Sequence, residues 1–437
     1  MKTKIHFTLY LFSLLIFNYS YSQTLIPDPI FEQYLIDEGY DTAPIDGSVP
    51  TANIVNVTIV DLNNTSVSNL TGIEAFTALT RLEVYNTLLS NLNVSQNTAL
   101  TYLEVSQTSL SSLDVSMNTA LTHLSAARIS LSSLDVSTNT ALTFLSVYMT
   151  SLSSLDVSTN IALTRLDAYI TSIPSLDIST NTALTNLDVF NTPLNNLDVS
   201  ANTALTNLNV SYTSLSSLDV STNTALTSLH AHNISIPSLD VSTNTALIDF
   251  SVNNTSINSL DISTNTALIY LQTQNTSLNN LDVSANIELT YLRVNNTSIN
   301  SLDVSTNTVL TTFYATDTPN LDCITVADEV VAMASTGIYA NWEKDLDCIY
   351  SEDCDALSVL EFETSKVYVG PNPIKDELNI VLNNLAVLNN VSLYDITGKL
   401  ILTSTSTHIS TSHIEPGLYL AKITTDKGGF TKKLVKN

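Results

Sequence analysis

The chain has 437 residues, of which 44% are hydrophobic and 13% are charged, and this balance excludes an intrinsically disordered protein. Its formal net charge is −26, and no lysine occurs between Lys4 and Lys344. Nucleic acid is therefore excluded as an expected partner, because binding to phosphate groups depends on clustered basic residues.

Residues 1–22 have the features of a signal peptide. Two lysines precede an apolar run over Phe7–Phe17, and Ser20 and Ser22 are small residues at the expected cleavage positions. A membrane anchor is disfavoured, because a spanning helix needs about 20 apolar residues. We therefore expect export, a mature chain without a transmembrane segment, and a compartment in which disulfides persist.

Residues 23–61 are predicted to form an N-terminal cap. Within them, the stretch Asp28–Gly39 (DPIFEQYLIDEG) places Phe31 and Leu35 at helical spacing and has acidic residues near its start. A short amphipathic helix at this point would cover the apolar end of the following repeats.

From Leu62 to Leu321 the sequence repeats every 21 residues. The segment SLSSLDVSTNTALT occurs at Ser130–Thr143 and again at Ser214–Thr227, four periods later. One column is leucine in every copy: Leu79, Leu100, Leu121, Leu142, Leu163, Leu184, Leu205, Leu226, Leu247, Leu268, Leu289 and Leu310. A unit of this size cannot close a core alone, whereas stacked coils bury each leucine against the next and pair their strands. The period predicts a solenoid of about twelve coils.

The repeat pattern L-x-x-L-x-V-x-x-T-x-L resembles that of the leucine-rich repeat, L-x-x-L-x-L-x-x-N-x-L. The resemblance implies a curved solenoid with a parallel β-sheet on its concave face. One departure is that threonine usually replaces the asparagine of the pattern, as at Thr87, Thr108 and Thr150. The hydrogen bonds that span the turn must then come from these hydroxyls or from neighbouring asparagines.

Two polar columns accompany the leucines. The first is an asparagine in each S-x-N-T turn, from Asn97 to Asn307, which we expect to bond to the adjacent coil. The second is an aspartate in each coil, from Asp114 to Asp303, although like charges in register repel. We expect these carboxylates to accept backbone N–H groups. Calcium bridging is the alternative, but no D-x-D-x-D-G loop is present.

Residues 322–360 break the period and contain all three cysteines of the chain and its only tryptophan, Trp342. We predict a C-terminal cap that is held by one disulfide. The candidate pairings join Cys323 to either Cys348 or Cys354.

Residues 361–437 are predicted to form a small β-sandwich. Short alternating strands such as Leu378–Leu382, Val391–Tyr394 and Gly417–Ile423 are separated by turn residues. Residues 366–437 carry eight lysines against five acids, whereas residues 23–365 carry five bases against 36 acids. The landmark residues are Pro371, Asn372, Pro373, Gly398, Lys399, Gly417, Tyr419, Lys432 and Lys433.

In order and position these landmarks resemble the type A C-terminal sorting domain of type IX secretion substrates. The resemblance implies that the type IX machinery is a partner of this tail. It also implies delivery to the outer-membrane surface of a Gram-negative bacterium, or release from it.

Function is expected in the positions that vary between copies, because the rest of the repeat is nearly constant. Drift would favour small polar residues, yet several strands carry large apolar ones. The candidate ligand-binding residues on the concave face are Tyr85, Tyr102, Phe144, Tyr148, Met149, Tyr169, Ile170, Phe190 and Tyr212. Exposed apolar clusters often mark contact sites, so we predict recognition or adhesion to a protein ligand. A polysaccharide ligand and a purely structural role in a surface layer or matrix are the alternatives.

Catalysis is not expected. The chain has no G-x-S-x-G, H-E-x-x-H or P-loop pattern. His230, His232 and Asp249 could approach one another as metal ligands, but their spacing provides no fourth ligand. We therefore predict a binding protein without a metal or another cofactor.

Overall fold

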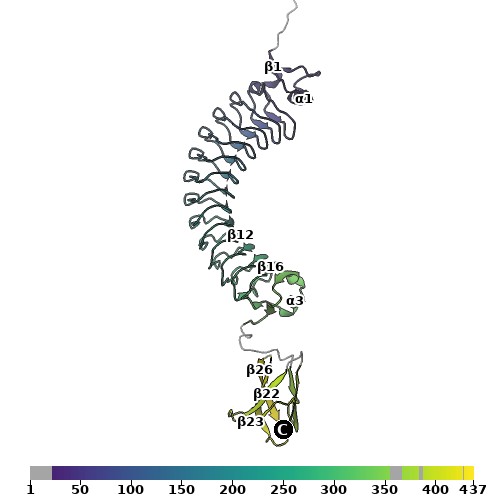
Figure 1. Ribbon diagram of the computed structural model, residues 1–437. Coiled ribbons are helices and arrows are strands. Elements are labelled where there is room, and N and C mark those ends of the chain that lie inside the picture. Colours follow the sequence, from purple (N-terminus) through teal and green to yellow (C-terminus); the bar gives the residue numbers. More distant parts are fainter. Residues whose placement is uncertain (1–21, 355–366, 383–386, 427) are drawn as a thin grey trace, which may run out of the picture. The chain divides into compact units, whose positions relative to one another are not determined.

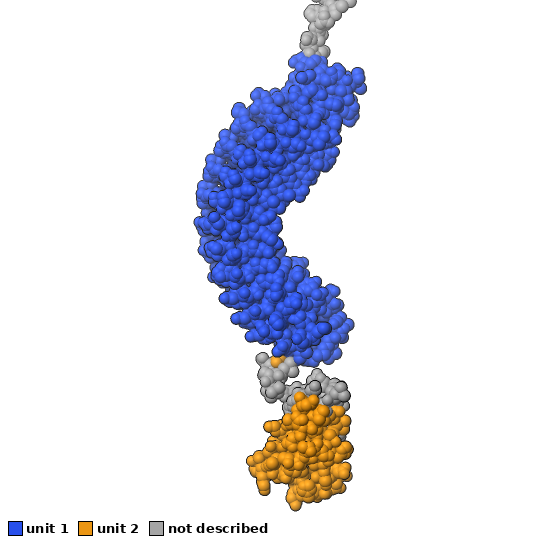
Figure 2. All heavy atoms as spheres, in the orientation of Figure 1, with its two compact units in different colours: residues 1–352 blue, residues 353–437 orange. Residues whose placement is uncertain are grey.

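The computed structural model describes residues 22–354, 367–382, 387–426 and 428–437. The predicted signal peptide therefore lies outside the described residues, except for Ser22. The chain divides into two compact units, Met1–Glu352 and Asp353–Asn437 (Figure 2). Each unit is described by itself below.

The first unit is a solenoid whose main sheet has 14 strands, all paired in parallel. From β4 to β16 paired residues are 21 positions apart, as in Asn186 with Asn207 and Tyr291 with Thr312. In Figure 1 these strands line the inner side of the curved unit. The strands are β3 (Ile59–Asp61), β4 (Arg81–Glu83), β5 (Tyr102–Glu104), β6 (His123–Ser125), β7 (Phe144–Ser146), β8 (Arg165–Asp167), β9 (Asn186–Asp188), β10 (Asn207–Asn209), β11 (Ser228–His230), β12 (Asp249–Ser251), β13 (Tyr270–Gln272), β14 (Tyr291–Arg293), β16 (Thr312–Ala315) and β18 (Asn341–Lys344). The parallel sheet that the repeat predicted is confirmed.

Each coil is held by the burial of its apolar columns. Leu100 and Leu103 are 0% exposed, their equivalents in other coils are at most 2% exposed, and Phe250 fills the strand position in β12. Burying one such side chain contributes about 1.5–3 kcal/mol. The column of leucines therefore supplies the main force that stacks one coil on the next.

The asparagine column joins adjacent coils, as predicted. Asn118 is fully buried, and its Nδ2 donates to the carbonyl oxygens of Val94 and Asn97, both at 2.9 Å. The equivalent two bonds recur in every coil from Asn97 to Asn307. Each bond crosses from one coil to the preceding one, so the column is structural.

Threonine hydroxyls make the turn-spanning bonds, which was one of the two alternatives that the departure from the pattern left open. Thr87 Oγ1 donates to the carbonyl oxygen of Val84 at 3.0 Å, and Thr150 Oγ1 donates to that of Val147 at 2.7 Å. Each hydroxyl satisfies a carbonyl that lies three residues earlier in its own coil.

The aspartate column uses its carboxylates in local turns. Asp156 Oδ1 accepts the backbone N–H of Ser158 at 2.9 Å, and every aspartate from Asp114 to Asp303 does the same for the serine two residues later. Hydrogen bonds from Ser158 also lower the pKa of Asp156. The side chains are exposed, so water screens their mutual repulsion.

The N-terminal cap consists of β1 (Gln23–Leu25), α1 (Pro29–Asp37), β2 (Ser48–Pro50), α2 (Thr51–Ile54) and the 3₁₀ turn η1 (Ile73–Ala75). Helix α1 occupies the predicted stretch and begins after Asp28, whose Oδ1 accepts the N–H groups of Ile30 and Phe31. Asp28 Oδ2 accepts the N–H of Ser68 in the first coil. One buried carboxylate thus caps the helix and attaches it to the solenoid.

At the other end, the main sheet continues beyond Leu321 into the segment predicted as a cap. Strand β18 pairs with β16 in parallel, and Trp342 of β18 packs on Phe313 of β16 at 4.8 Å between ring centroids. The indole Nε1 donates to the carbonyl oxygen of Leu310 at 2.9 Å. The remaining elements here are β15 (Leu302–Asp303), β17 (Cys323–Thr325), α3 (Glu329–Met333), the 3₁₀ turn η2 (Gly337–Ala340) and β19 (Ile349–Ser351).

Cys323 and Cys354 are both disulfide-bonded, whereas Cys348 is a buried free thiol. Burial raises the pKa of Cys348 to about 11, so this side chain remains a neutral thiol at physiological pH.

The second unit has two antiparallel sheets around one core. The strands are β20 (Val367–Gly370), β21 (Glu377–Leu382), β22 (Leu388–Asp395), β23 (Leu400–Ser404), β24 (His408–Ser410), β25 (Gly417–Thr425) and β26 (Gly428–Lys436). Leu378 of one sheet and Leu393 of the other belong to the same buried cluster. The predicted small β-sandwich is confirmed, and its three predicted strands lie within β21, β22 and β25.

Candidate functional site

The concave sheet presents two side chains from each strand on its solvent side. Because side chains alternate along a strand, a buried central residue places the first and third residues on the opposite face. In β5 the central Leu103 is 0% exposed, whereas Tyr102 and Glu104 are partly exposed. The same alternation repeats from β4 to β14, so the strand residues form two columns along the face, although the third residue is itself buried in β6, β7, β8 and β12.

One candidate cluster is a continuous stack in the first strand position. The rings of Tyr102 and His123 lie 4.1 Å apart, and those of His123 and Phe144 are also 4.1 Å apart. Arg81 Cζ lies 3.7 Å from the Tyr102 centroid at one end, and Arg165 Cζ lies 5.7 Å from the Phe144 centroid at the other. Two guanidinium groups therefore bracket three parallel rings, an arrangement stabilised by cation–π attraction.

Burial within this stack lowers the pKa of His123 to about 4, and the nearby Arg81 acts in the same direction. The imidazole is therefore neutral at physiological pH. It serves as a flat aromatic member of the stack rather than as a cation.

A second cluster, the aromatic column, lies two residues beyond the strands. Its rings are Tyr148, Tyr169 and Phe190, of which Tyr148 and Tyr169 stack at 4.3 Å. Phe190 meets Tyr212, which lies one residue further along the next coil, edge to face at 5.2 Å. Tyr212 is 49% exposed, so these rings remain accessible. Tyr85 occupies the equivalent position in an earlier coil, but Ser106 and Ala127 separate it from Tyr148 in this column.

The next residue of each coil has a left-handed backbone. This left-handed column has φ between 53° and 58° throughout, and its members are Asn64, Asn86, Gln107, Arg128, Met149, Ile170, Asn191, Tyr212, Asn233, Asn254, Asn275, Asn296 and Asp317. Asparagine tolerates this conformation, whereas other side chains are disfavoured and a β-branched residue is an outlier. Where the column is asparagine, it also forms a ladder: Asn275 Nδ2 donates to Asn254 Oδ1 at 2.7 Å.

The middle coils depart from this asparagine rule. Gln107, Arg128, Met149 and Ile170 follow one another, and Tyr212 occurs two coils later. The predicted ligand residues Met149, Ile170 and Tyr212 are thus held in a strained conformation, next to the aromatic column. The sequence analysis did not identify this strain, because the positive φ is seen only in the backbone of the structure.

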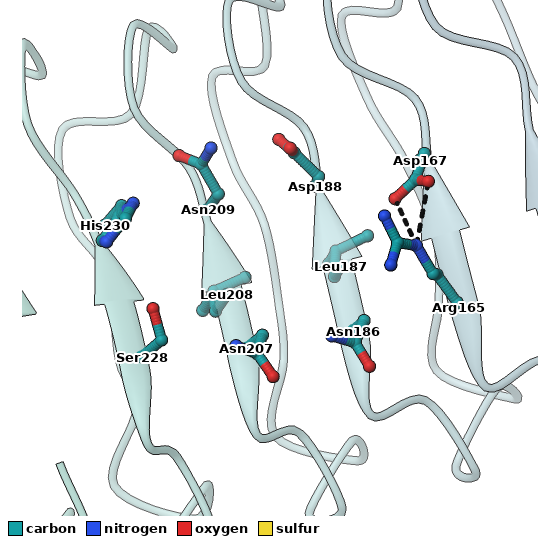
Figure 3. Close-up of a pocket in the computed structure, with 10 residues that line it drawn as sticks. All are labelled: Arg165, Asp167, Asn186, Leu187, Asp188, Asn207, Leu208, Asn209, Ser228 and His230. Carbon is teal, nitrogen blue, oxygen red and sulfur yellow. Dashed lines mark hydrogen bonds and ion pairs between the residues drawn. The ribbon is translucent and has the colours of Figure 1, made fainter. Parts of the chain in front are cut away.

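A polar hollow of about 210 Å³ lies further along the same face, over strands β8–β11 (Figure 3). Its lining includes Arg165, Asp167, Asp188, Asn207 and His230. Arg165 Nε donates to Asp167 Oδ2 at 2.9 Å. Burial raises the pKa of both Asp167 and Asp188. The sequence did not identify this hollow, which exists only because neighbouring strands bring these side chains together.

The histidines near the hollow bond to other groups rather than converging on an ion. His230 Nε2 lies 3.0 Å from Asp249 Oδ2, whereas His232 Nδ1 lies 2.9 Å from the side-chain nitrogen of Asn233. The hydrogen bond with Asp249 raises the pKa of His230. Within the described residues, no group of three His, Cys, Asp or Glu side chains is arranged to hold a metal ion.

Sequence reasoning left a further aromatic group out of the site. Tyr270, Tyr291 and Tyr314 lie on β13, β14 and β16, with ring centroids 6.0 and 6.1 Å apart. Arg293 Cζ lies 5.1 Å from the Tyr314 centroid. The recurrence of tyrosine at the first position of two adjacent strands, Tyr270 and Tyr291, was the signal that could have identified part of this group; Tyr314 lies at the position equivalent to Arg293.

The predicted sorting residues shape the second unit. Asn372 lies between Pro371 and Pro373, and its Oδ1 accepts the N–H of Val435 at 2.7 Å on the last strand. Tyr419 Oη donates to the carbonyl oxygen of Glu415. Gly398 has φ +84° in the turn before Lys399, and Gly417 begins β25. Lys432 and Lys433 are exposed on β26.

Comparison with known families decides what this unit is. Residues 366–437 match the family described as the secretion system C-terminal sorting domain. The tail is a type IX sorting domain. The protein is therefore a bacterial protein that is secreted or displayed at the cell surface. No curated protein matches the chain.

Solved structures show the fold of the solenoid. The chain is similar to the functional domain of InlJ from Listeria monocytogenes, with 25% identity, a TM-score of 0.59 and coverage of 95% of this chain and 99% of that one. A leucine-rich repeat protein of Leptospira interrogans shares 17% identity, with a TM-score of 0.59 and coverage of 68% and 85%. The solenoid has the leucine-rich repeat fold. In the part of the chain that the structure describes, no helix has the length and apolar character needed to cross a membrane.

Proposed function

We propose that this protein is a non-catalytic recognition or adhesion module that binds a protein ligand on its concave face. The sorting domain would deliver it to the outer-membrane surface of a Gram-negative bacterium, or release it from there. The ligand would lie across the middle coils, where the aromatic column and the large residues of the left-handed column are adjacent.

The left-handed column carries this proposal. Ile170 at φ 54° and Met149 at φ 53° occupy positions that asparagine fills in most other coils. Residues held in disfavoured backbone regions cost about 1–3 kcal/mol each and cluster at functional sites. Asparagine occupies this position in seven coils and would relieve the strain. The fold therefore does not explain why large side chains occur at these positions in the middle coils. Contact with a ligand provides an explanation.

The chemistry of the surface agrees with a protein ligand. Met149 is 42% exposed and follows Tyr148, whose ring stacks on that of Tyr169. Tyr212 is 49% exposed and contacts the ring of Phe190. Aromatic and methionine side chains are enriched in protein interfaces, and truncating an aromatic anchor typically costs about 2 kcal/mol or more.

A carbohydrate ligand is the second candidate, and the polar hollow is the observation that favours it. Asn186, Asn207 and Asp188 supply amide and carboxylate groups that suit sugar hydroxyls. The aromatic column could supply rings for stacking. No comparable observation favours a purely structural role.

The proposal is tested with the triple variant Tyr148→Ser, Tyr169→Ser, Phe190→Ser. The exported protein is used to select binders from a phage-displayed random peptide library and is also applied to a glycan array. We expect peptide binding that the triple variant weakens at least tenfold, with its fold retained. Since these side chains lie outside the leucine core, their removal opens no cavity. Sugar binding without peptide binding would transfer the function to the second candidate.

A further inference from the structure

The concave face uses one arrangement of charge and aromatic ring twice. On β4, Arg81 Nε bonds to Glu83, and the guanidinium lies over the ring of Tyr102 on the next strand. On β8, Arg165 Nε bonds to Asp167, and the guanidinium faces the ring of Phe144 on the preceding strand. In both places, an arginine at the first strand position bonds to the acid at the third position and faces a neighbouring ring.

Strand β9 has the acid of this arrangement without the arginine. Asp188 occupies the third position, but the first position is Asn186. Asp188 Oδ1 accepts the N–H of Phe190 at 3.0 Å, and no ion pair to Asp188 is found among the described residues. The nearest arginine, Arg165, already bonds to Asp167 with both distances near 3 Å.

The polar hollow lies beside this unpaired carboxylate. Figure 3 shows Asp188 above Asn186 on β9, with Asn209 on the adjacent strand β10 at the same level. Asn207 Oδ1 accepts from the hydroxyl of Thr206, which orients its amide group. Burial raises the pKa of Asp188, and this effect outweighs the hydrogen bonds from Phe190 and Asn209 and the charge of Arg165, which act in the opposite direction.

We propose that the polar hollow binds the guanidinium group of an arginine from the protein ligand, with Asp188 as its carboxylate partner. This inference rests on the proposed function and names one contact of that interface. Guanidinium is favoured because it can form two parallel hydrogen bonds with a carboxylate. An arginine–carboxylate pair already occurs on the neighbouring strand, where Arg165 Nε is shared between the two carboxylate oxygens of Asp167. Residues 23–365 carry five bases against 36 acids, so their field attracts basic ligands.

Asp188→Asn is the direct test, and the chain itself indicates that this variant folds. Asn209 is the equivalent residue on β10, and its Oδ1 accepts the N–H of Ser211 at 3.2 Å as Asp188 does for Phe190. Asp219→Asn is the matched control, because it removes the same charge from an exposed turn outside the sheet. Melting curves establish that both variants are folded.

The probe is the set of peptides selected on the exported protein. We expect them to contain arginine, and we expect Asp188→Asn to weaken their binding at least tenfold while Asp219→Asn leaves it unchanged. Replacing the peptide arginine by glutamine should weaken binding similarly. Combining that change in the peptide with Asp188→Asn should weaken binding little further, because both changes remove the same contact.

Two results would overturn the inference, and they have different consequences. Peptides that depend on Tyr148, Tyr169 and Phe190 but not on Asp188 would refute the arginine site and leave the proposed function intact. The absence of any peptide binding, with sugars bound on the glycan array instead, would refute both.

Discussion

Single buried residues explain how one coil attaches to the next. Asn160 is 0% exposed, and its Nδ2 donates to the carbonyl oxygens of Val136 at 3.0 Å and Asn139 at 2.9 Å. Its Oδ1 has no partner within the described residues. The side chain is therefore retained for its two donors, which satisfy backbone carbonyls that water cannot reach.

Asn160→Ala should lower the free energy of unfolding by about 2–3 kcal/mol, because two buried carbonyls lose their donors. Urea unfolding measures the change. Thr159→Ala is the control, since it removes one exposed hydroxyl that donates to Ser137 and should cost less than about 1 kcal/mol. Equal effects from the two variants would contradict the account.

The pKa values of His123 and His230 should be shifted in opposite directions from the ordinary value of histidine. Burial lowers the pKa of His123 to about 4, whereas Asp249 raises that of His230 above its ordinary value. Between pH ~6.5 and ~4 the unfolded chain binds a proton at His123 that the native protein does not bind, so this residue reduces stability as pH falls through that window. His230 contributes stability that is complete below pH ~6.5 and is lost as pH rises through its folded pKa.

NMR titration of the histidine side chains measures both values. The account predicts that the His123 signal changes near pH 4 and that the His230 signal changes above pH ~6.5. A His123 signal that titrates near pH 6.5 would mean that the stack between Tyr102 and Phe144 is open to water.

At the scale of the element, some features of each coil can be predicted from the sequence and others cannot. Spacing of 21 residues identifies the strands, because burial requires leucine at a fixed place in every coil. The hydroxyl bonds of Thr87 and Thr150 also followed from the pattern. The left-handed backbone at Met149 was not predicted. Many residues of this column are asparagine, which tolerates that conformation, but the pattern alone does not give the value of φ.

A reciprocal exchange tests the left-handed column. Ile170→Asn should raise the free energy of unfolding by about 1 kcal/mol, because a β-branched residue is relieved of a disfavoured φ. Asn191→Ile, in the next coil at φ 53°, should lower it by at least as much. Urea midpoints provide both values. No gain from Ile170→Asn would show that Ile170 is not under strain.

At the scale of the whole molecule, the two units have separate cores. The buried cluster of the solenoid ends at Tyr350, and that of the second unit begins at Val369. The sequence predicted both units because each has its own periodicity. It could not reveal the polar hollow, because the ion pair of Arg165 with Asp167, rather than with Asp188, depends on side-chain geometry.

Deleting residues 366–437 should block export and leave the solenoid folded. The two cores share no residue, so the melting temperature of the solenoid should stay within about 2 °C of its value in the full chain. Cell fractionation and circular dichroism measure the two outcomes. A truncated chain that still reaches the surface would contradict the role of the sorting domain.

The central claim is that the large residues held at positive φ in the middle coils contact the ligand. Its most direct test measures peptide affinity and stability together in the triple variant Met149→Asn, Ile170→Asn, Tyr212→Asn, with peptides selected on the unmodified protein. The account predicts a variant that is more stable by about 1–3 kcal/mol and binds at least tenfold more weakly. A variant that is more stable and binds equally well would contradict it, because the strained side chains would then have no part in binding.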